Sequence, residues 1–224
     1  VLTAHRAPNS FKPDGSDMKR LTNTDGYDAE GTISPDGKKI VFTSVRDSDI
    51  DVYDMNLDGS QPRRLTSELG YDGGAFYSQD SQWIVYRASR PNTPADIAKY
   101  KDLLARDLVM PEKLEILMMR ADGSQKTQLT SNGAANFAPY FHPNGRQIIF
   151  ASNVNNPNPR SPNFDLYLIN RNGSGLEQIT FDDGFDGFPM FTNDGKKLVW
   201  ASNRHGSTPE NTNVFIADWV DSGS

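Results

Sequence analysis

The sequence of 224 residues contains no cysteine, which excludes disulfides, thiolate chemistry and cysteine-ligated metal sites. No apolar run approaches the ~20 residues that a membrane-spanning helix needs, and the N-terminus lacks a signal-peptide pattern. A formal net charge of -6 disfavours a surface for nucleic acid or anionic membranes. A Gly-x-Ser-x-Gly nucleophile elbow and a Walker-type phosphate loop are also missing. These absences point away from an enzyme with standard catalytic motifs, and the lack of cysteine fits a periplasmic or secreted protein.

What the sequence does have is an internal repeat, marked by two kinds of turn and a Leu-Thr or Ile-Thr pair. The first turn begins at Ser34, Ser78, His142 and Thr192, the second at Asp14, Asp58, Asp122 and Asn172, and the pair at Leu21, Leu65, Leu129 and Ile179. All three series have the same intervals of 44, 64 and 50 residues. The chain is therefore a repeat of about 44 residues whose second and third copies are longer.

Each repeat contains four strand-like runs, and the two turns reverse the chain after the first run and after the third. A bulky aromatic stands eight positions after the start of each first turn, and we expect it to pack neighbouring units together: Phe42, Tyr86, Phe150 and Trp200. The pattern predicts an all-β fold, a single-domain β-propeller of four-stranded antiparallel blades. The expected blades are residues 25–66, 69–130, 133–180 and 183–220.

The two ends of the repeat are incomplete in complementary ways. Residues 14–22 form a lone fourth strand, whereas the last blade stops after its third strand, Asn213–Val220. Pairing of Met18–Thr22 with Asn213–Val220 would close the ring and remove its exposed edges. A closed four-bladed ring and the C-terminal part of a larger propeller are both compatible with this pattern.

The repeat also resembles that of a known family. The segments Ser34-Pro35-Asp36-Gly37-Lys38, Asp58-Gly59-Ser60 and Arg64-Leu65-Thr66 are similar to the repeat of TolB-like propellers, and to the propeller domains of prolyl-oligopeptidase-type and tricorn-type peptidases. The resemblance covers nearly the whole chain. It implies a periplasmic propeller that binds a protein, as TolB binds a peptidoglycan-associated lipoprotein. TolB-like propellers usually have six blades, and TolB has an N-terminal helical domain that this sequence lacks. The resemblance therefore favours part of a six-bladed parent.

Loops between second and third strands vary in length and share one face of the predicted propeller: residues 91–114, 155–163 and 205–212. Loops on a rigid scaffold usually carry function. The insertion 91–114 predicts a helix that Thr93 caps, Pro94 begins and Pro111 ends. Its apolar face contains Ile97, Tyr100, Leu104 and Leu108. The helix is expected to act as a lid, a gate to the channel or an epitope for a partner.

Oxygen-bearing side chains recur six residues before each first turn and are expected to ring the mouth of the central channel: Asp28, Asp72, Asn136 and Asp186. Asp28, Asp72 and Asp186 could bind Ca²⁺ there, with Glu30 as a further ligand. The competing interpretation is structural. Arg46, Arg90 and Arg204 end second strands on the same face, so an Asp–Arg pair in each blade would brace the ring. The three histidines, His5, His142 and His205, are expected on different faces and do not predict a shared site.

The leading functional hypothesis is a non-catalytic scaffold that binds a protein or peptide on the variable-loop face, with Ca²⁺ as a candidate ligand of the channel. One alternative is the substrate-gating propeller of a larger peptidase or other hydrolase. A second is a carbohydrate-active enzyme working at the channel mouth, against which the scattered histidines argue. The sequence predicts neither a nucleic-acid partner nor a membrane span, and it does not indicate an oligomeric state.

Overall fold

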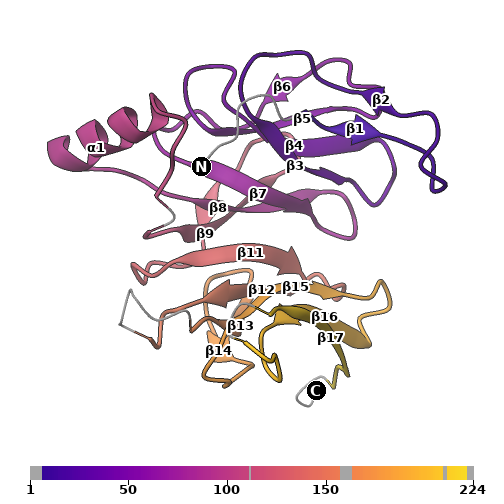
Figure 1. Cartoon of the computed structure of the whole chain (residues 1–224), viewed down its shortest axis with the longest axis vertical. Helices are drawn as coiled ribbons and strands as arrows, with labels where there is room; N and C mark the ends of the chain where they lie inside the picture. Colours follow the sequence, from indigo (N-terminus) through magenta and orange to yellow (C-terminus); the bar gives the residue numbers. More distant parts are fainter. Residues whose placement is uncertain (1–6, 111, 157–162, 209–210, 221–224) are drawn as a thin grey trace.

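The computed structural model describes residues 7–110, 112–156, 163–208 and 211–220 (Figure 1). It contains four consecutive blades of a β-propeller, each an antiparallel sheet whose strands follow chain order. Blade one comprises β3 (Asp28–Ile33), β4 (Lys39–Ser44), β5 (Asp51–Asn56) and β6 (Arg63–Arg64); blade two β7 (Asp72–Tyr77), β8 (Trp83–Ala88), β9 (Glu115–Arg120) and β10 (Thr127–Gln128); blade three β11 (Asn136–Phe141), β12 (Gln147–Ser152), β13 (Asp165–Asn170) and β14 (Glu177–Gln178); and blade four β15 (Asp186–Phe191), β16 (Lys197–Ser202) and β17 (Asn213–Asp218). The predicted fold class is thus confirmed, with a fourth blade of three strands.

Local chemistry fixes the turns that the repeat marked. In blade one, Gly37 has a φ of +68°, a left-handed conformation that favours glycine, and its N–H donates to the carbonyl of Ser34 at 2.8 Å. The Ser34 hydroxyl donates to Asp36 Oδ1 at 2.6 Å and accepts from the N–H of Lys39 at 2.9 Å. Each first turn is therefore a closed hydrogen-bonded unit that a short segment of sequence specifies.

The core lies between blades. Phe42, Tyr86 and Phe150 are fully buried and Trp200 nearly so, as expected from their equivalent positions. Each lies in an apolar cluster that joins its blade to the preceding unit; Leu166 and Leu168 of blade three, for example, are in one cluster with Trp200. Because one aromatic recurs at each junction, neighbouring blades meet through the same kind of contact.

The N-terminal strand does not close the ring. The hairpin of β1 (Asn9–Ser10) and β2 (Lys19–Arg20) pairs with itself, and the outer edge of β17 has no strand partner among the described residues. The expected pairing of Met18–Thr22 with Asn213–Val220 is therefore wrong for this structure. Leu21 is instead buried in a cluster with residues of β4 and β5, so the hairpin lies against blade one. Within the described ranges, no strand of blade four contacts a strand of blade one, and Figure 1 shows these blades at opposite ends of the long axis.

The insertion in blade two forms helix α1 (Pro94–Leu104), with Thr93 as the N-cap and Pro94 in the first turn, as predicted. The Thr93 hydroxyl accepts from the N–H of Asp96 at 3.1 Å. The helix ends at Leu104 and not at Pro111, because the chain turns after Ala105 and Asp107 adopts a positive φ of 55°. In the described part of the chain, no helix has the length and apolarity to span a membrane.

Candidate functional site

The starts of β3, β7, β11 and β15 and the ends of β4, β8, β12 and β16 lie on one side of the propeller, here called the loop face. The first residue of each innermost strand is buried there: Asp28, Asp72, Asn136 and Asp186. Each aspartate accepts from the arginine of its own blade, at 3.1 Å for Arg46 and Asp28, 2.7 Å for Arg90 and Asp72, and 2.5 Å for Arg204 and Asp186. The predicted Asp–Arg pairs are thus formed in blades one, two and four.

Blade three lacks the Asp–Arg pair, and its residues at these two positions indicate the role of the pair in the other blades. Asn136 replaces the aspartate, and Val154 stands where the other blades have arginine. Asn136 Nδ2 donates to the carbonyl of Leu114 at 2.7 Å, to Asn132 Oδ1 at 2.8 Å and to Glu115 Oε2 at 3.3 Å, so its buried amide is satisfied without a guanidinium. The carboxylate and the guanidinium disappear together in this blade. That is the pattern expected when each charge is present to neutralise the other.

Calcium binding is not supported by this geometry. Among the described residues, no group of three or more His, Asp or Glu side chains is arranged to hold a metal ion. Asp28, Asp72 and Asp186 each lie against a guanidinium of their own blade, which leaves no common set of oxygen ligands. The alternative interpretation, an Asp–Arg brace, accounts for the contacts in blades one, two and four, whereas blade three lacks the predicted pair.

The Asp–Arg pairs of blades one and two differ in the pKa of their carboxylates. Burial acts to raise the pKa of Asp28, but hydrogen bonds from Ser44 and Thr24 outweigh it, and the pKa lies below its ordinary value. Burial raises the pKa of Asp72 to about 7, because the opposing effect of Arg90 is smaller than the cost of enclosing that carboxylate. Of these two carboxylates, Asp72 is therefore the one whose charge changes near neutral pH.

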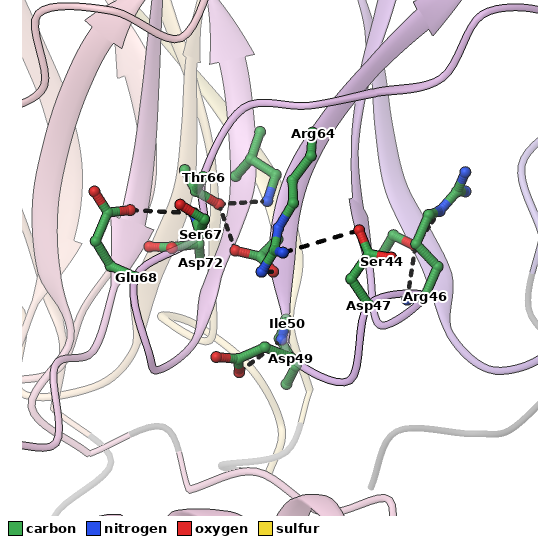
Figure 2. Close-up of polar contacts among 12 residues, drawn as sticks. Ser44, Arg46, Asp47, Asp49, Ile50, Arg64, Thr66, Ser67, Glu68 and Asp72 are labelled. Carbon is green, nitrogen blue, oxygen red and sulfur yellow. Dashed lines mark hydrogen bonds and ion pairs between the residues drawn. The ribbon is translucent and has the colours of Figure 1, made fainter.

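A second polar layer connects third and fourth strands on the loop face (Figure 2). Thr66 Oγ1 donates to Asp51 Oδ1 at 3.0 Å and accepts from the N–H of Val52 at 2.9 Å. Arg64 donates to Asp51 Oδ2 at 2.5 Å and lies between Thr66 and Asp47 in Figure 2. The same threonine-to-carboxylate bond recurs in blade two, from Thr130 to Glu115 at 2.6 Å. The repeat landmarks did not predict this acid, although an Asp or Glu stands fifteen residues before the threonine in three repeats.

The sequence suggested that Glu30 would join Asp28 as a ligand of a cation. In the structure Glu30 does not take that role. It occupies a bulge of β3 with a φ of +56° and contacts blade two. Its carboxylate accepts from Arg87 at 2.6 Å, from the N–H of Gly74 at 2.8 Å and from Thr43 at 2.9 Å. A Cβ at Gly74 would lie 2.6 Å from Arg87 Nη1, so glycine there provides the space for the guanidinium. Glu30 therefore joins two blades, and its oxygens already have donors.

Aromatic side chains gather where blades three and four meet on the loop face. Phe137, Phe164, Phe185 and Phe188 form one cluster with ring centroids 5.0–6.2 Å apart. Phe188 is the bulge residue of β15, equivalent to Glu30 in β3, and 58% of its surface is exposed. The repeat pattern did not predict this cluster, because these phenylalanines stand at different repeat positions and only the fold brings them together. The cluster thus presents one exposed phenylalanine ring, supported by three half-buried ones, on the loop face.

Helix α1 adds a groove to the same face. Tyr100 donates to Asp49 Oδ1 at 2.5 Å, and Tyr100 and Leu104 pack against Ile50 and Tyr71. A cavity of about 360 Å³ lies between the helix and the end of β8, lined in part by Arg90, Lys99 and Met110. The predicted apolar face of the helix is thus half-buried against the propeller, and the opposite face of the helix remains exposed.

The two histidines in the described ranges do not form a site. His142 is buried against Phe191 on the side opposite the loop face, with ring centroids 4.3 Å apart, whereas His205 is exposed in a loop of blade four. His5 lies outside the described residues. The two described histidines therefore give the carbohydrate-active alternative no cluster to support it.

Comparison with known proteins finds solved structures with a similar fold. No family model and no curated protein matches the chain. Among solved structures, TolB from Acinetobacter baumannii superposes with a TM-score of 0.71 and 22% identity, over 92% of this chain and 44% of that one. A putative TolB from Agrobacterium tumefaciens gives a TM-score of 0.69 and 20% identity, over 95% of this chain and 76% of that one. An acylaminoacyl peptidase from Pyrococcus horikoshii gives 0.54 and 16%, over 91% of this chain and 32% of that one.

These likenesses define a class of structure. The chain is a β-propeller whose blades are similar to those of TolB proteins, and propeller-containing peptidases are among its structural neighbours, as the repeat motif predicted. It spans less than half the length of the Acinetobacter TolB. At this level of identity the likeness establishes the fold.

Proposed function

We propose that this propeller is a non-catalytic scaffold that binds an apolar segment of a protein or peptide on its loop face. The observation that carries the proposal is the exposed ring of Phe188 within a cluster of four phenylalanines. Large aromatics held rigidly by their neighbours lose little entropy on binding and commonly dominate interface energies. The likeness to TolB proteins supports a protein partner and a periplasmic location.

A selection experiment tests the proposal with random peptides in the place of a natural partner. A phage-displayed library would be selected on the whole chain, and the affinity of enriched peptides measured by fluorescence polarisation. Phe188→Ala should weaken binding by about 30-fold, the effect of losing an aromatic hot spot. Phe181→Ala is the matched control, because Phe181 is an exposed phenylalanine outside the cluster. Failure to enrich any peptide, or equal loss in both variants, would count against the loop-face site.

A second candidate function is the gating propeller of a larger peptidase. The structural likeness to acylaminoacyl peptidase supports it. In that case the cavity beside α1 would border a path for substrate, and the parent reading frame would encode a hydrolase domain. Sequencing the full reading frame distinguishes the two candidates.

A further inference from the structure

Two arginines stack on Trp83 at the junction of blades two and three, on the side opposite the loop face, here called the turn face. Trp83 begins β8, Arg120 ends β9 directly opposite it, and Arg171 follows the last residue of β13. The guanidinium carbons of Arg120 and Arg171 lie 4.2 and 4.5 Å from the centre of the Trp83 ring. Blades two and three each have all four strands, so both sides of this junction are present.

Both guanidiniums have only neutral hydrogen-bond acceptors among the described residues. Arg120 Nε donates to Gln125 Oε1 at 3.3 Å, and Arg171 Nη1 donates to the carbonyl of Gly145 at 3.0 Å. Within the described ranges, no carboxylate forms an ion pair with either arginine. Burial lowers the pKa of Arg171, and the charge of Arg120 acts in the same direction, against the opposing effect of Asp80. Two half-buried like charges therefore share one ring, and most of their side-chain N–H groups remain available as donors.

The repeat shows that the fold itself does not require these cations. In the other three blades, the pair of positions equivalent to Trp83 and Arg120 contains an oxygen acceptor: Lys39–Asn56, Gln147–Asn170 and Lys197–Asp218. Both lysines donate to that acceptor, at 2.8 and 2.6 Å. Trp83 and Arg120 have donors only. The position of Arg171 is apolar in the other blades, where it is Leu57, Ala121 and Trp219.

The geometry of the two side chains suits a carboxylate. A guanidinium is planar, stacks on an aromatic ring and presents a fork of N–H groups that matches the two oxygens of a carboxylate. Stacking on Trp83 holds both forks before any ligand arrives. Asp80 and Asp122 lie near enough to Arg171 and Arg120 to offset part of their charge without forming ion pairs with them. The remaining positive charge therefore favours a singly charged carboxylate over a phosphate group, which carries about two charges.

We propose that Arg120 and Arg171, positioned by Trp83, form a second binding site that takes a carboxylate side chain from an acidic segment of a protein partner. The carboxylate would accept from the outer N–H groups of both guanidiniums and neutralise their mutual repulsion. This site lies on the turn face, whereas Phe188 lies on the loop face. It therefore binds its segment independently of the proposed apolar site.

A peptide titration followed by NMR tests the site on the whole chain. A short glutamate peptide with blocked ends should shift the indole N–H signal of Trp83 and not that of Trp200, which is buried between blades three and four. A glutamine peptide of the same length is the control for contacts that need no charge, and it should shift neither signal. Added salt should weaken binding of the glutamate peptide, because it screens the attraction between exposed charges.

Two substitutions use residues that blade one has at the same positions, so folding should be retained. Arg120→Asn copies Asn56, and Arg171→Leu copies Leu57. Each should raise the dissociation constant of the glutamate peptide by at least about 10-fold, because each removes a charged hydrogen-bond donor. Arg106→Asn is the matched control, since Arg106 is an exposed arginine beside α1 on the loop face and should not affect this binding.

The variant Arg171→Lys separates a built site from a general positive field. Lysine keeps the charge but lacks the planar fork and the stacking, so the affinity should fall nearly as far as in Arg171→Leu. Binding as tight as that of the parent chain in Arg171→Lys, or in both Arg120→Asn and Arg171→Leu, would overturn the proposal. A Trp83 signal that the glutamate peptide does not shift would also overturn it. Tighter binding of a phosphoserine peptide of the same length would overturn the choice of a carboxylate.

Discussion

The Asp186–Arg204 pair offers a direct test of whether the recurring carboxylates brace the blades. Asp186 is fully buried, with Arg204 Nη2 2.5 Å from its Oδ2 and Trp200 Nε1 3.2 Å from its Oδ1. Arg204→Val removes the charged donor to this buried carboxylate and leaves the neutral donor Trp200 Nε1. Removing one partner of a buried ion pair typically costs about 3–5 kcal/mol, and we expect a loss of that order.

The double variant Asp186→Asn/Arg204→Val reproduces the combination that blade three has naturally in Asn136 and Val154. Its buried charges are gone together, so the remaining loss should be about 1–2 kcal/mol. Part of that comes from the stacking of Arg204 on Trp200, whose ring centroid lies 5.3 Å from the guanidinium carbon. The coupling energy between the two sites should therefore be at least about 2 kcal/mol.

Urea unfolding followed by tryptophan fluorescence measures these free energies of unfolding. Asp186→Asn alone provides the fourth corner of the cycle. Additive losses in the double variant, or a loss below about 1 kcal/mol for Arg204→Val, would refute bracing. The carboxylate would then have to be retained for another reason, such as binding a cation.

Three other measurements address the blade junctions, the braces and a buried acid. Phe150→Ala should lower the free energy of unfolding by about 3–5 kcal/mol, because the ring is fully buried between blades; a small loss in calorimetry would contradict the assigned packing. Addition of a chelator and then of Ca²⁺ should leave the melting temperature unchanged if bracing is correct, whereas a rise on adding Ca²⁺ would point to a metal site. Burial and the neighbouring Asp186 raise the pKa of Asp165 to about 6, above its ordinary value of 3.8. The folded state therefore binds the extra proton between these pH values, so this group's contribution to stability falls as pH rises from about 4 to 6. Asp165→Asn should consequently be more favourable, relative to the parent chain, at pH 7.5 than at pH 4.5, and equal effects in melting curves at both would exclude that assignment.

Short-range features of this protein could be predicted from its sequence. The turns at Ser34 and its equivalents are held by bonds between residues at most five apart, so the local residues specify them wherever they occur. The identical spacing of three landmarks predicted the blades, and the aromatic at Phe42 and its equivalents predicted the junctions. The arginine partners of Asp28, Asp72 and Asp186 were also predictable, because the same separation recurs within single blades.

Tertiary structure decided the contacts between blades that do not recur at one repeat position. Glu30 meets Arg87 from a separation of 57 residues, and the four phenylalanines of the cluster that includes Phe188 share no repeat position. The choice between a metal site and a brace depends on a few ångströms in the placement of guanidinium groups, which spacing along the chain does not determine. Whether blade four contacts blade one depends on the angle between successive blades. Side-chain packing sets that angle at every junction, and the angles add up along the chain. The repeat pattern predicted that Met18–Thr22 would pair with Asn213–Val220, but in the structure β2 pairs with β1 and lies against blade one.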